Sequence, residues 1–223
     1  MVNRQGESMK RTHLTAVALG LVVLTGAGLF VYAGESNKMS PEFRKQFIDN
    51  FQRTSLNTTP GDAMMLRILV EASGAKRGVE VGTASGFGAI NMGIAFERTA
   101  GHLWTFDIDP KAVQETQENL RKVGLEKVVT CVEGDALKTL QDVQGPIDFV
   151  FIDAVKRDYL KYLKILEPKL KVGAVVVADN VIKSARAMKD YLDYVQTSPD
   201  YDTVLIRASM EKDDGMTISY KIK

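Results

Sequence analysis

Short apolar runs alternate with amphipathic segments between residues 78 and 195, and this alternation constrains the fold more than any other feature of the chain. Each strand-like run is followed by a segment whose apolar residues recur at helical spacing. Such a βα repeat predicts an α/β fold with a mostly parallel sheet and helices on both faces. The predicted strands are 78–81, 103–106, 128–132, 149–152 and 174–178, and the clearest helices are 111–123, 159–166 and 185–195.

The two ends of this repeat follow other patterns. The last strand-like runs, 203–206 and 217–222, have no helical pattern between them, so they predict an antiparallel edge. Phenylalanines at helical spacing within 35–60 predict a helix that packs on the main domain. Asp62 is the predicted cap of a following helix over 63–72.

An uncharged stretch of 19 residues, 14–32, makes the N-terminus a separate segment. About 20 apolar residues span a bilayer, and Lys10 and Arg11 stand directly before the stretch. We favour an uncleaved membrane anchor. A cleaved signal ending near Ala33 is the alternative, and a buried core helix is a weaker one. The predicted organisation is an anchor or signal at 1–34, a helical lead-in at 35–60 and one catalytic domain at 61–223.

Charge and cysteine content exclude several classes of protein. The 29 basic and 28 acidic residues leave a net charge of +1, so no overall field attracts nucleic acid, and we predict none as a partner. Cys131 is the only cysteine, which excludes disulfide frameworks and thiolate zinc sites. With His13 in the N-terminal flank, a Ser-His-Asp mechanism would depend entirely on His102.

A glycine-rich turn follows the first predicted strand, where open α/β sheets bind ligands. Gly82, Gly86 and Gly88 are spaced G-x-x-x-G-x-G, which departs from the dinucleotide pattern G-x-G-x-x-G and disfavours a pyrophosphate. Asp107, at the end of the second strand, lies where an acid commonly accepts hydrogen bonds from a ribose. The pattern therefore predicts a nucleoside without phosphates.

Two further acids favour a cationic nucleoside. Glu80 near the glycine turn would repel a pyrophosphate but attract a sulfonium or ammonium group, which points to S-adenosylmethionine. Asp135, at the end of the third strand, is placed to accept from an adenine amino group. Each acid has a simpler interpretation: Glu80 as a helix-capping or loop-pairing carboxylate, and Asp135 as the N-cap of the next helix.

Oxygen-bearing side chains end the fourth and fifth predicted strands. Asp153 follows one apolar run, and Asp179 and Asn180 follow the next. Three oxygen ligands at neighbouring strand ends suit a hard cation such as Mg²⁺. Lys156 is close enough along the chain to face the same pocket. The alternatives are strand-end acids satisfied by backbone amides and a solvated lysine beside Arg157.

Four segments together resemble a known family, the cation-dependent O-methyltransferases, which include the catechol and caffeoyl-CoA enzymes. They are Val79-Glu80-Val81-Gly82-Thr83, Phe106-Asp107-Ile108-Asp109-Pro110, Phe151-Ile152-Asp153-Ala154-Val155-Lys156 and Ala178-Asp179-Asn180-Val181. The resemblance covers about residues 54–223. It implies a class I methyltransferase (Rossmann-like) fold with seven strands, the last hairpin antiparallel.

The resemblance also implies roles for individual residues. Lys156 would be the catalytic base, and Asp153, Asp179 and Asn180 would hold a divalent cation. Gly88 stands where many relatives have a serine. The residues implied to surround S-adenosylmethionine are Glu80, Gly82, Thr83, Gly88, Asp107, Asp135, Ala136 and Asp153.

The implied activity is methyl transfer from S-adenosylmethionine to a hydroxyl of a metal-chelated, catechol-like aromatic. Val155 and the segment 182–184 depart from the caffeoyl-CoA type, and Glu211 receives no role. We expect a membrane protein held through 14–32 with a cytosolic catalytic domain; export after cleavage is the alternative, and a homodimer is left open. Two other functions stay open: a membrane-tethered nucleoside-binding protein without turnover, and a nicotinamide-dependent oxidoreductase.

Overall fold

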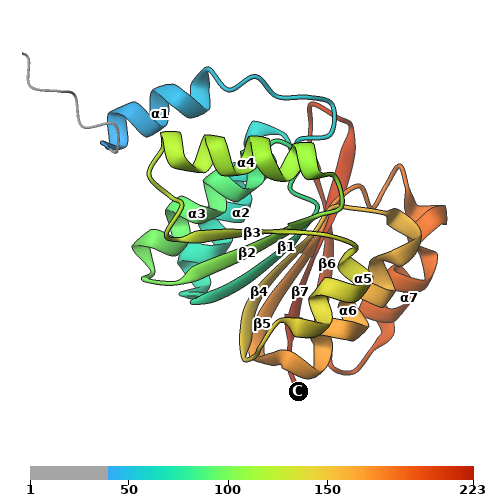
Figure 1. The fold of residues 1–223 in the computed structure, drawn as a ribbon. Helices are drawn as coiled ribbons and strands as arrows, with labels where there is room; N and C mark the ends of the chain where they lie inside the picture. The colour runs from blue at the N-terminus through green and yellow to red at the C-terminus, as the bar shows by residue number, and fades with distance from the viewer. Residues whose placement is uncertain (1–39) are drawn as a thin grey trace, which may run out of the picture. The chain divides into compact units, whose positions relative to one another are not determined.

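The computed structural model describes residues 40–223 (Figure 1). The predicted N-terminal hydrophobic helix and the membrane segment 14–32 lie outside these residues, so both stay predictions, as do the domain boundaries and the location in the cell. Between residues 40 and 223, no helix is both long enough and apolar enough to cross a bilayer.

Seven strands form one sheet in the order β3-β2-β1-β4-β5-β7-β6. The first five strands along the chain run parallel, whereas β7 is antiparallel to both β5 and β6. The mostly parallel sheet and its antiparallel final hairpin are therefore confirmed. The strands are β1 (Arg77–Val81), β2 (His102–Asp107), β3 (Val129–Glu133), β4 (Ile147–Ile152), β5 (Leu170–Ala178), β6 (Tyr201–Ser209) and β7 (Asp214–Lys221).

Helices cover both faces of this sheet, as predicted (Figure 1). One layer contains α2 (Pro60–Ser73), α3 (Phe87–Arg98) and α4 (Pro110–Lys122), and the other contains α5 (Ala136–Thr139), α6 (Tyr159–Leu166) and α7 (Lys189–Thr197). Short 3₁₀ turns link several elements: η1 (Leu140–Asp142), η2 (Lys156–Asp158), η3 (Glu167–Lys169) and η4 (Ala185–Met188).

The central strands β4 and β5 bury side chains on both faces, which explains the apolar runs 149–152 and 174–178. All six residues of β4 are buried. Val150 and Ile152 belong to the apolar core under α6 and α7, whereas Phe149 and Phe151 belong to the core under α2 and α3. Alternate residues of a strand point to opposite faces, so a single run supplies both cores. The carboxyl ends of these rigid strands then position the site.

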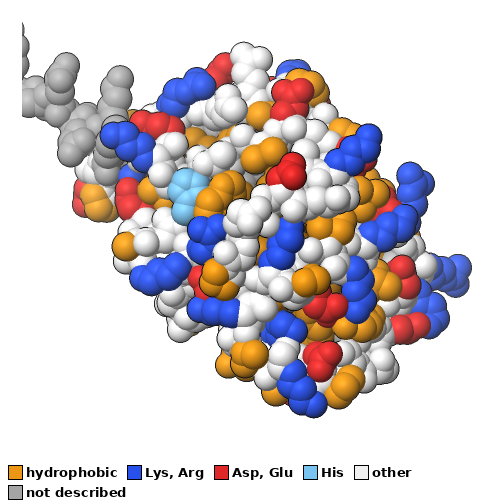
Figure 2. Space-filling view, turned by 60° about the horizontal axis from the view of Figure 1, so that its bottom comes forward, with side chains coloured by type: hydrophobic (Ala, Val, Ile, Leu, Met, Phe, Trp, Pro, Cys, Tyr) orange, Lys and Arg blue, Asp and Glu red, His pale blue; other side chains and the backbone are white. Residues whose placement is uncertain are grey.

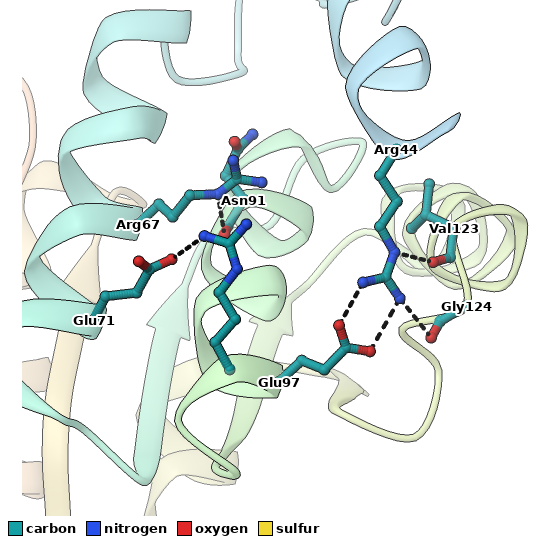
Figure 3. A network of polar contacts seen from close by, with 8 residues as sticks. Arg44, Arg67, Glu71, Asn91, Glu97, Val123 and Gly124 are labelled. Carbon is teal, nitrogen blue, oxygen red and sulfur yellow. Dashed lines mark hydrogen bonds and ion pairs between the residues drawn. The ribbon is translucent and has the colours of Figure 1, made fainter. Parts of the chain in front are cut away.

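The lead-in helix α1 (Pro41–Asp49) packs on the domain through Phe43, Phe47 and Ile48, as predicted, and also through Arg44 (Figure 3). Its guanidinium donates to the carbonyl oxygens of Val123 at 2.8 Å and Gly124 at 3.4 Å, and pairs with the carboxylate of Glu97, 3.0 Å from Oε1. Two of these acceptors follow α4 and the third lies near the end of α3. Arg44 therefore joins the lead-in to two helices of the domain.

Most element boundaries differ from the predicted ones by a few residues, for example β5 begins at Leu170 and not at 174, and two helices also begin in an unpredicted way. The helix predicted over 63–72 begins at Pro60, and its N-cap is Thr59, whose hydroxyl accepts from the Asp62 amide at 3.2 Å. Asp62 is therefore not the cap; proline at the first helical position starts this helix rather than breaking it. The helix predicted over 185–195 begins as η4 and becomes α-helical only in α7.

Candidate active site

The glycine turn after β1 lies against the end of β4. Gly82 has a φ of 97°, a conformation that other residues rarely adopt, and its amide donates to the Phe106 carbonyl at 2.8 Å. A Cβ added at Gly82 would clash with the carbonyl oxygen of Asp153. A residue without a side chain is therefore needed at Gly82, because the ends of β1 and β4 approach each other here. The same approach brings Asp153 beside the turn.

Asp107, at the end of β2, organises the same turn. Its Oδ2 accepts from the amides of Thr83 and Ala84, both at 3.0 Å, and its Oδ1 accepts from the Asp109 amide at 3.1 Å. A carboxylate has about four lone-pair sites, so these bonds leave room for a further donor. Asp107 and Thr83 thus lie together beside the turn, and their roles toward a ribose stay predictions.

Glu80 lies inside β1, where it is 1% exposed. It neither caps a helix nor pairs with a loop, because its Oε2 accepts from the hydroxyl of Thr105 on β2 at 2.5 Å. Burial raises the pKa of Glu80 to about 8, against the opposite effect of the Thr105 hydrogen bond. Gly88 leaves space for this side chain, since an added Cβ would be 2.6 Å from Glu80 Oε1. A cationic ligand here would favour the ionised form of Glu80.

Glu80→Gln should flatten the dependence of the unfolding free energy on pH. The pKa of Glu80 is about 8 in the folded chain, against an ordinary value of 4.5, so between these pH values the folded chain holds the extra proton. Wild-type stability should then fall as pH rises, by on the order of 2 kcal/mol from pH 6 to pH 8. Glutamine is neutral throughout and lacks this contribution.

Urea unfolding of the ligand-free protein at pH 6 and pH 8 measures the difference. Glu118→Gln is a matched control, because Glu118 is an exposed carboxylate on α4 and should leave the pH dependence unchanged. Equal pH dependence in the wild type and Glu80→Gln would show that Glu80 is already ionised in the folded chain.

A narrow pocket opens at the glycine turn, and part of its wall was missed in the sequence. The segment before α2 contributes Asn57 and Thr58, both almost fully buried. Asn57 Nδ2 and Thr58 Oγ1 have no hydrogen-bond partner. The sequence did not indicate Asn57 and Thr58 as site residues, because both precede the glycine turn by more than twenty residues and lie in a segment rich in residues that disfavour a helix. The pocket is lined by Leu56, Asn57, Thr58, Glu80, Gly82, Thr83, Ala84, Gly88, Phe151 and Asp153.

Asp135 and Ala136 lie at the start of α5, after β3. The Asp135 side chain accepts from the Leu137 amide at 3.0 Å and caps the helix, so the simpler interpretation of this acid is correct. Capping uses one carboxylate oxygen and is compatible with a second partner. A role for Asp135 and Ala136 toward an adenine stays a prediction.

Lys156 lies between the ends of β4 and β5. Its Nζ donates to Asp153 Oδ1 at 2.7 Å and to the Tyr159 hydroxyl at 2.8 Å, and that hydroxyl donates to the backbone carbonyl of Asp179 at 3.2 Å. The Lys156 side chain is 25% exposed, so it is not the solvated lysine of the alternative interpretation. Tyr159 was not predicted as a site residue. Asp153, Lys156 and Tyr159 are spaced three residues apart, however, and this spacing could have indicated that their side chains lie on one side of the chain.

Asp179 is a fully buried carboxylate at the end of β5. Its amide donates to the Ile152 carbonyl at 3.0 Å, which aligns it with the end of β4. Oδ1 accepts from the Asn180 amide at 2.6 Å, but Oδ2 has no partner. Burial and the nearby Asp153 raise the pKa of Asp179. A backbone amide therefore satisfies only one of the two oxygens of this carboxylate.

Asn180 is held in an unusual conformation by Asp214 at the start of β7. Its φ is 62°, a left-handed value that asparagine tolerates better than most residues. Asn180 Nδ2 lies 3.5 Å from Asp214 Oδ2, and Asp214 Oδ1 accepts from the amides of Ile182 and Lys183 at 3.0 and 3.1 Å. With its nitrogen turned to Asp214, Asn180 keeps its amide oxygen for another partner. Asp214 was also missed in the sequence.

Carboxylate, histidine and cysteine side chains do not gather in threes to form a metal site anywhere in residues 40–223. The predicted set of Asp153, Asp179 and Asn180 contains two carboxylates and an amide oxygen. Asp153 and Asp179 lie close enough for each charge to act on the other. Their role as metal ligands stays a prediction.

His102, the candidate for hydrolase chemistry, lies at the amino end of β2, whereas the pocket lies at the carboxyl ends. Its Nε2 is 2.8 Å from the Thr130 hydroxyl. Figure 2 shows the single described histidine in pale blue at the surface, on a face where basic and acidic side chains are interspersed. His102 therefore takes no part in the site around Lys156.

Known proteins resemble this chain in sequence and in fold. A family model described as O-methyltransferase matches residues 32–219. Catechol O-methyltransferase from Mycobacterium tuberculosis is 33% identical over 147 residues, which cover 66% of this chain and 63% of that protein. Catechol O-methyltransferase from Niastella koreensis is 31% identical over 140 residues, which cover 61% of this chain and 63% of that protein.

The solved structure of cofactor-bound Rv0187 from MTB has the same fold, with a TM-score of 0.72 and 26% identity over 86% of this chain and 92% of that one. The two catechol O-methyltransferases match this chain over less than two thirds of their own length. The family model, in contrast, spans residues 32–219, which is most of the chain. Because this family model matches more than half of the sequence, and a solved structure shares the fold, the chain belongs to the O-methyltransferase family.

Proposed function

We propose that this chain transfers a methyl group from S-adenosylmethionine to a hydroxyl of a catechol-like aromatic, with the help of a divalent cation. The observation that carries the proposal is the contact of Lys156 with Asp153 and Tyr159 beside the half-satisfied carboxylate of Asp179. Membership of the O-methyltransferase family and the names of the catechol relatives support it.

The pocket at the glycine turn fits the two kinds of charge in an amino-acid-bearing sulfonium. Glu80 supplies a buried acid for cationic groups. The unpartnered Asn57 Nδ2 and Thr58 Oγ1 can donate to a carboxylate. Buried polar groups are normally hydrogen-bonded, so these two atoms indicate a missing partner. A nucleoside amino acid supplies both kinds of partner.

The ends of β4 and β5 fit a hard divalent cation. Asp179 Oδ2 is buried and lacks a partner, Asp153 lies near it, and Asn180 keeps an amide oxygen. Carboxylate and amide oxygens are the ligands that Mg²⁺ prefers, and it usually keeps several positions for water or substrate. A cation would also neutralise the two neighbouring acids. We therefore propose Mg²⁺ with Asp153, Asp179 and Asn180 as its ligands.

When bound, S-adenosylmethionine supplies the methyl group, and the cation polarises two neighbouring hydroxyls. The chain itself provides the base and the positioning. After losing one proton to solvent, Lys156 Nζ is a neutral amine that can still donate to Asp153 Oδ1 and the Tyr159 hydroxyl, and its free lone pair accepts the proton of one substrate hydroxyl. Glu80 and Asp107 hold the donor against rigid strand ends, so that the oxygen and the methyl carbon stay aligned.

Methyl transfer to catechol should depend on both the donor and the cation. The full-length protein, incubated with radiolabelled S-adenosylmethionine and catechol, should form methylated catechol when Mg²⁺ is present. Excess EDTA should lower the rate by more than about 100-fold, because it removes the cation that the two substrate hydroxyls bind. Excess Mg²⁺ added after EDTA should restore the rate.

Resorcinol is a matched control, since its two hydroxyls are not adjacent and cannot chelate one ion. It should be methylated at least about 10-fold more slowly than catechol. No transfer to any dihydroxybenzene would contradict the proposed function. Transfer that persists unchanged in EDTA would contradict only the role of the cation.

A further inference from the structure

The turn between β6 and β7 brings a lysine to the edge of the proposed site. Lys212 Nζ donates to the backbone carbonyl of Asn57 at 2.7 Å, and Asn57 lines the pocket with Glu80 and Asp153. Two residues further along the turn, Asp214 Oδ2 lies 3.5 Å from Asn180 Nδ2, at the end of β5. The turn that carries Lys212 therefore adjoins both the wall of the pocket and the segment of the proposed metal ligands.

Every acid beside Lys212 is bound to another partner. Glu211 pairs with Arg53 at 3.0 Å, and Asp213 lies 3.5 Å from Arg207. Asp214 accepts from backbone amides, including that of Gly215 at 2.9 Å. Within residues 40–223, Lys212 forms no ion pair with a carboxylate, and its hydrogen bond goes to a neutral carbonyl.

A second ammonium adds to the positive charge here. Lys183 Nζ, from the segment after β5, contacts the backbone carbonyl of Lys212 and also has no ion pair in the described part of the chain. Lys156 differs, because its charge is already compensated by Asp153 at 2.7 Å. The side of the site formed by the β6–β7 turn thus carries uncompensated positive charge, whereas the proposed metal ligands on the other side are acidic.

An ammonium has three donor hydrogens, and the Asn57 carbonyl uses one of those on Lys212. Hydrogen bonds between an ammonium and a carboxylate are about twice as strong as those between neutral groups. A half-buried ammonium without an acidic partner is therefore suited to bind an anionic group of a ligand. In the proposed function, Asn57 Nδ2 and Thr58 Oγ1 serve the carboxylate of S-adenosylmethionine, so the anionic group left for Lys212 belongs to the methyl acceptor.

We propose that Lys212 selects methyl acceptors that carry a carboxylate, so that the substrates of this chain are aromatic acids with two neighbouring hydroxyls. This inference rests on the proposed function and specifies its substrate class. The two hydroxyls lie toward Asp153 and Asp179, and the carboxylate lies toward the β6–β7 turn. Lys212 is a specificity-determining residue and takes no part in the proton or methyl transfer.

A matched pair of acceptors tests the proposal. 3,4-Dihydroxybenzoate and 3,4-dihydroxybenzamide have the same ring and hydroxyls and differ in charge. For the full-length wild type with Mg²⁺, kcat/KM should be at least about 10-fold higher for the acid. In Lys212→Met this ratio should fall to within about twofold of unity, mainly through a higher KM for the acid, and Lys212→Arg should keep the preference.

Lys189→Met is the control, because Lys189 is an exposed lysine on α7 that pairs with Asp193, and its ratio should equal that of the wild type. If Lys212 only holds the Asn57 segment in place, Lys212→Met will slow both acceptors equally and leave the ratio unchanged, which overturns the proposal. Equal rates for both acceptors in the wild type overturn it too. The absence of transfer to either acceptor and to catechol contradicts the proposed function itself.

Discussion

Asp179→Asn is expected to lower methyl transfer to catechol by more than about 100-fold, since changes to residues that merely support metal ligands already cost 10- to 100-fold. The asparagine keeps the volume of the side chain and can still accept from the Asn180 amide, now at 2.6 Å from Asp179 Oδ1. It removes the charge of a buried carboxylate whose Oδ2 has no partner. Binding of Mg²⁺, followed by calorimetry, should weaken by a similar factor.

Two controls separate this effect from misfolding. Burial and Asp153 both disfavour the ionised form of Asp179, so the metal-free variant at pH 8 should unfold at the same temperature as the wild type or higher. Asp193→Asn, which changes an exposed carboxylate on α7, should leave both methyl transfer and Mg²⁺ binding unchanged. If Asp179→Asn binds Mg²⁺ as tightly as the wild type, Asp179 is not a ligand.

The sheet could be predicted from the sequence because its strands are buried on both faces. The second parts of β4 and β5, 149–152 and 174–178, are continuous apolar runs, and each is followed by a polar residue, Asp153 and Asp179. A parallel sheet brings those ends to one edge, so neighbouring side chains could be inferred without knowing any contact. The family resemblance supplied the individual roles, which the structure leaves as predictions.

Contacts between distant segments could not be predicted in this way. Thr105 reaches Glu80 because β1 and β2 pair in a register that places residues 80 and 105 side by side. Asn57 joins the glycine turn through the Ser85 hydroxyl, which donates to its Oδ1 at 2.9 Å. Neither pair has a local pattern in the chain. The position of Lys212 likewise depends on the length of the final hairpin.

Local sequence patterns were ambiguous where one residue type occurs in two kinds of local structure. Asp62 was predicted to cap the helix over 63–72, yet proline is favoured at the first position of a helix, and α2 begins at Pro60 with Thr59 as its cap. Asp135 lay between two interpretations because an acid after a strand can cap the next helix and still bind a ligand. In both cases the residue fits two structures, and only the surrounding fold decides between them.

Lys156→Arg should lower kcat for catechol by about 10²- to 10⁴-fold, the usual contribution of a general base. Arginine keeps the positive charge and can still pair with Asp153, which lies 2.7 Å from Lys156 Nζ. A guanidinium does not give up its proton in proteins, so it cannot accept one from the substrate. The variant therefore separates a base from a residue that only supplies charge.

The pH dependence should distinguish the two roles further. A phenolic hydroxyl ionises by itself near pH 10, so the rate of Lys156→Arg should rise with pH up to that value and recover part of the loss. The wild type, which has its own base, should depend less on pH over the same range. Initial rates at saturating S-adenosylmethionine between pH 7 and pH 10 give both profiles.

A neighbouring pair of residues supplies the control for this substitution. Lys161 Nζ lies 2.7 Å from Asp158 Oδ1, with the same three-residue spacing and the same distance as the pair of Lys156 and Asp153. Lys161 is 61% exposed, so Lys161→Arg should leave kcat unchanged. If Lys156→Arg retains a rate within about twofold of the wild type at pH 7, Lys156 acts through its charge, and the base must be sought among other groups of the site.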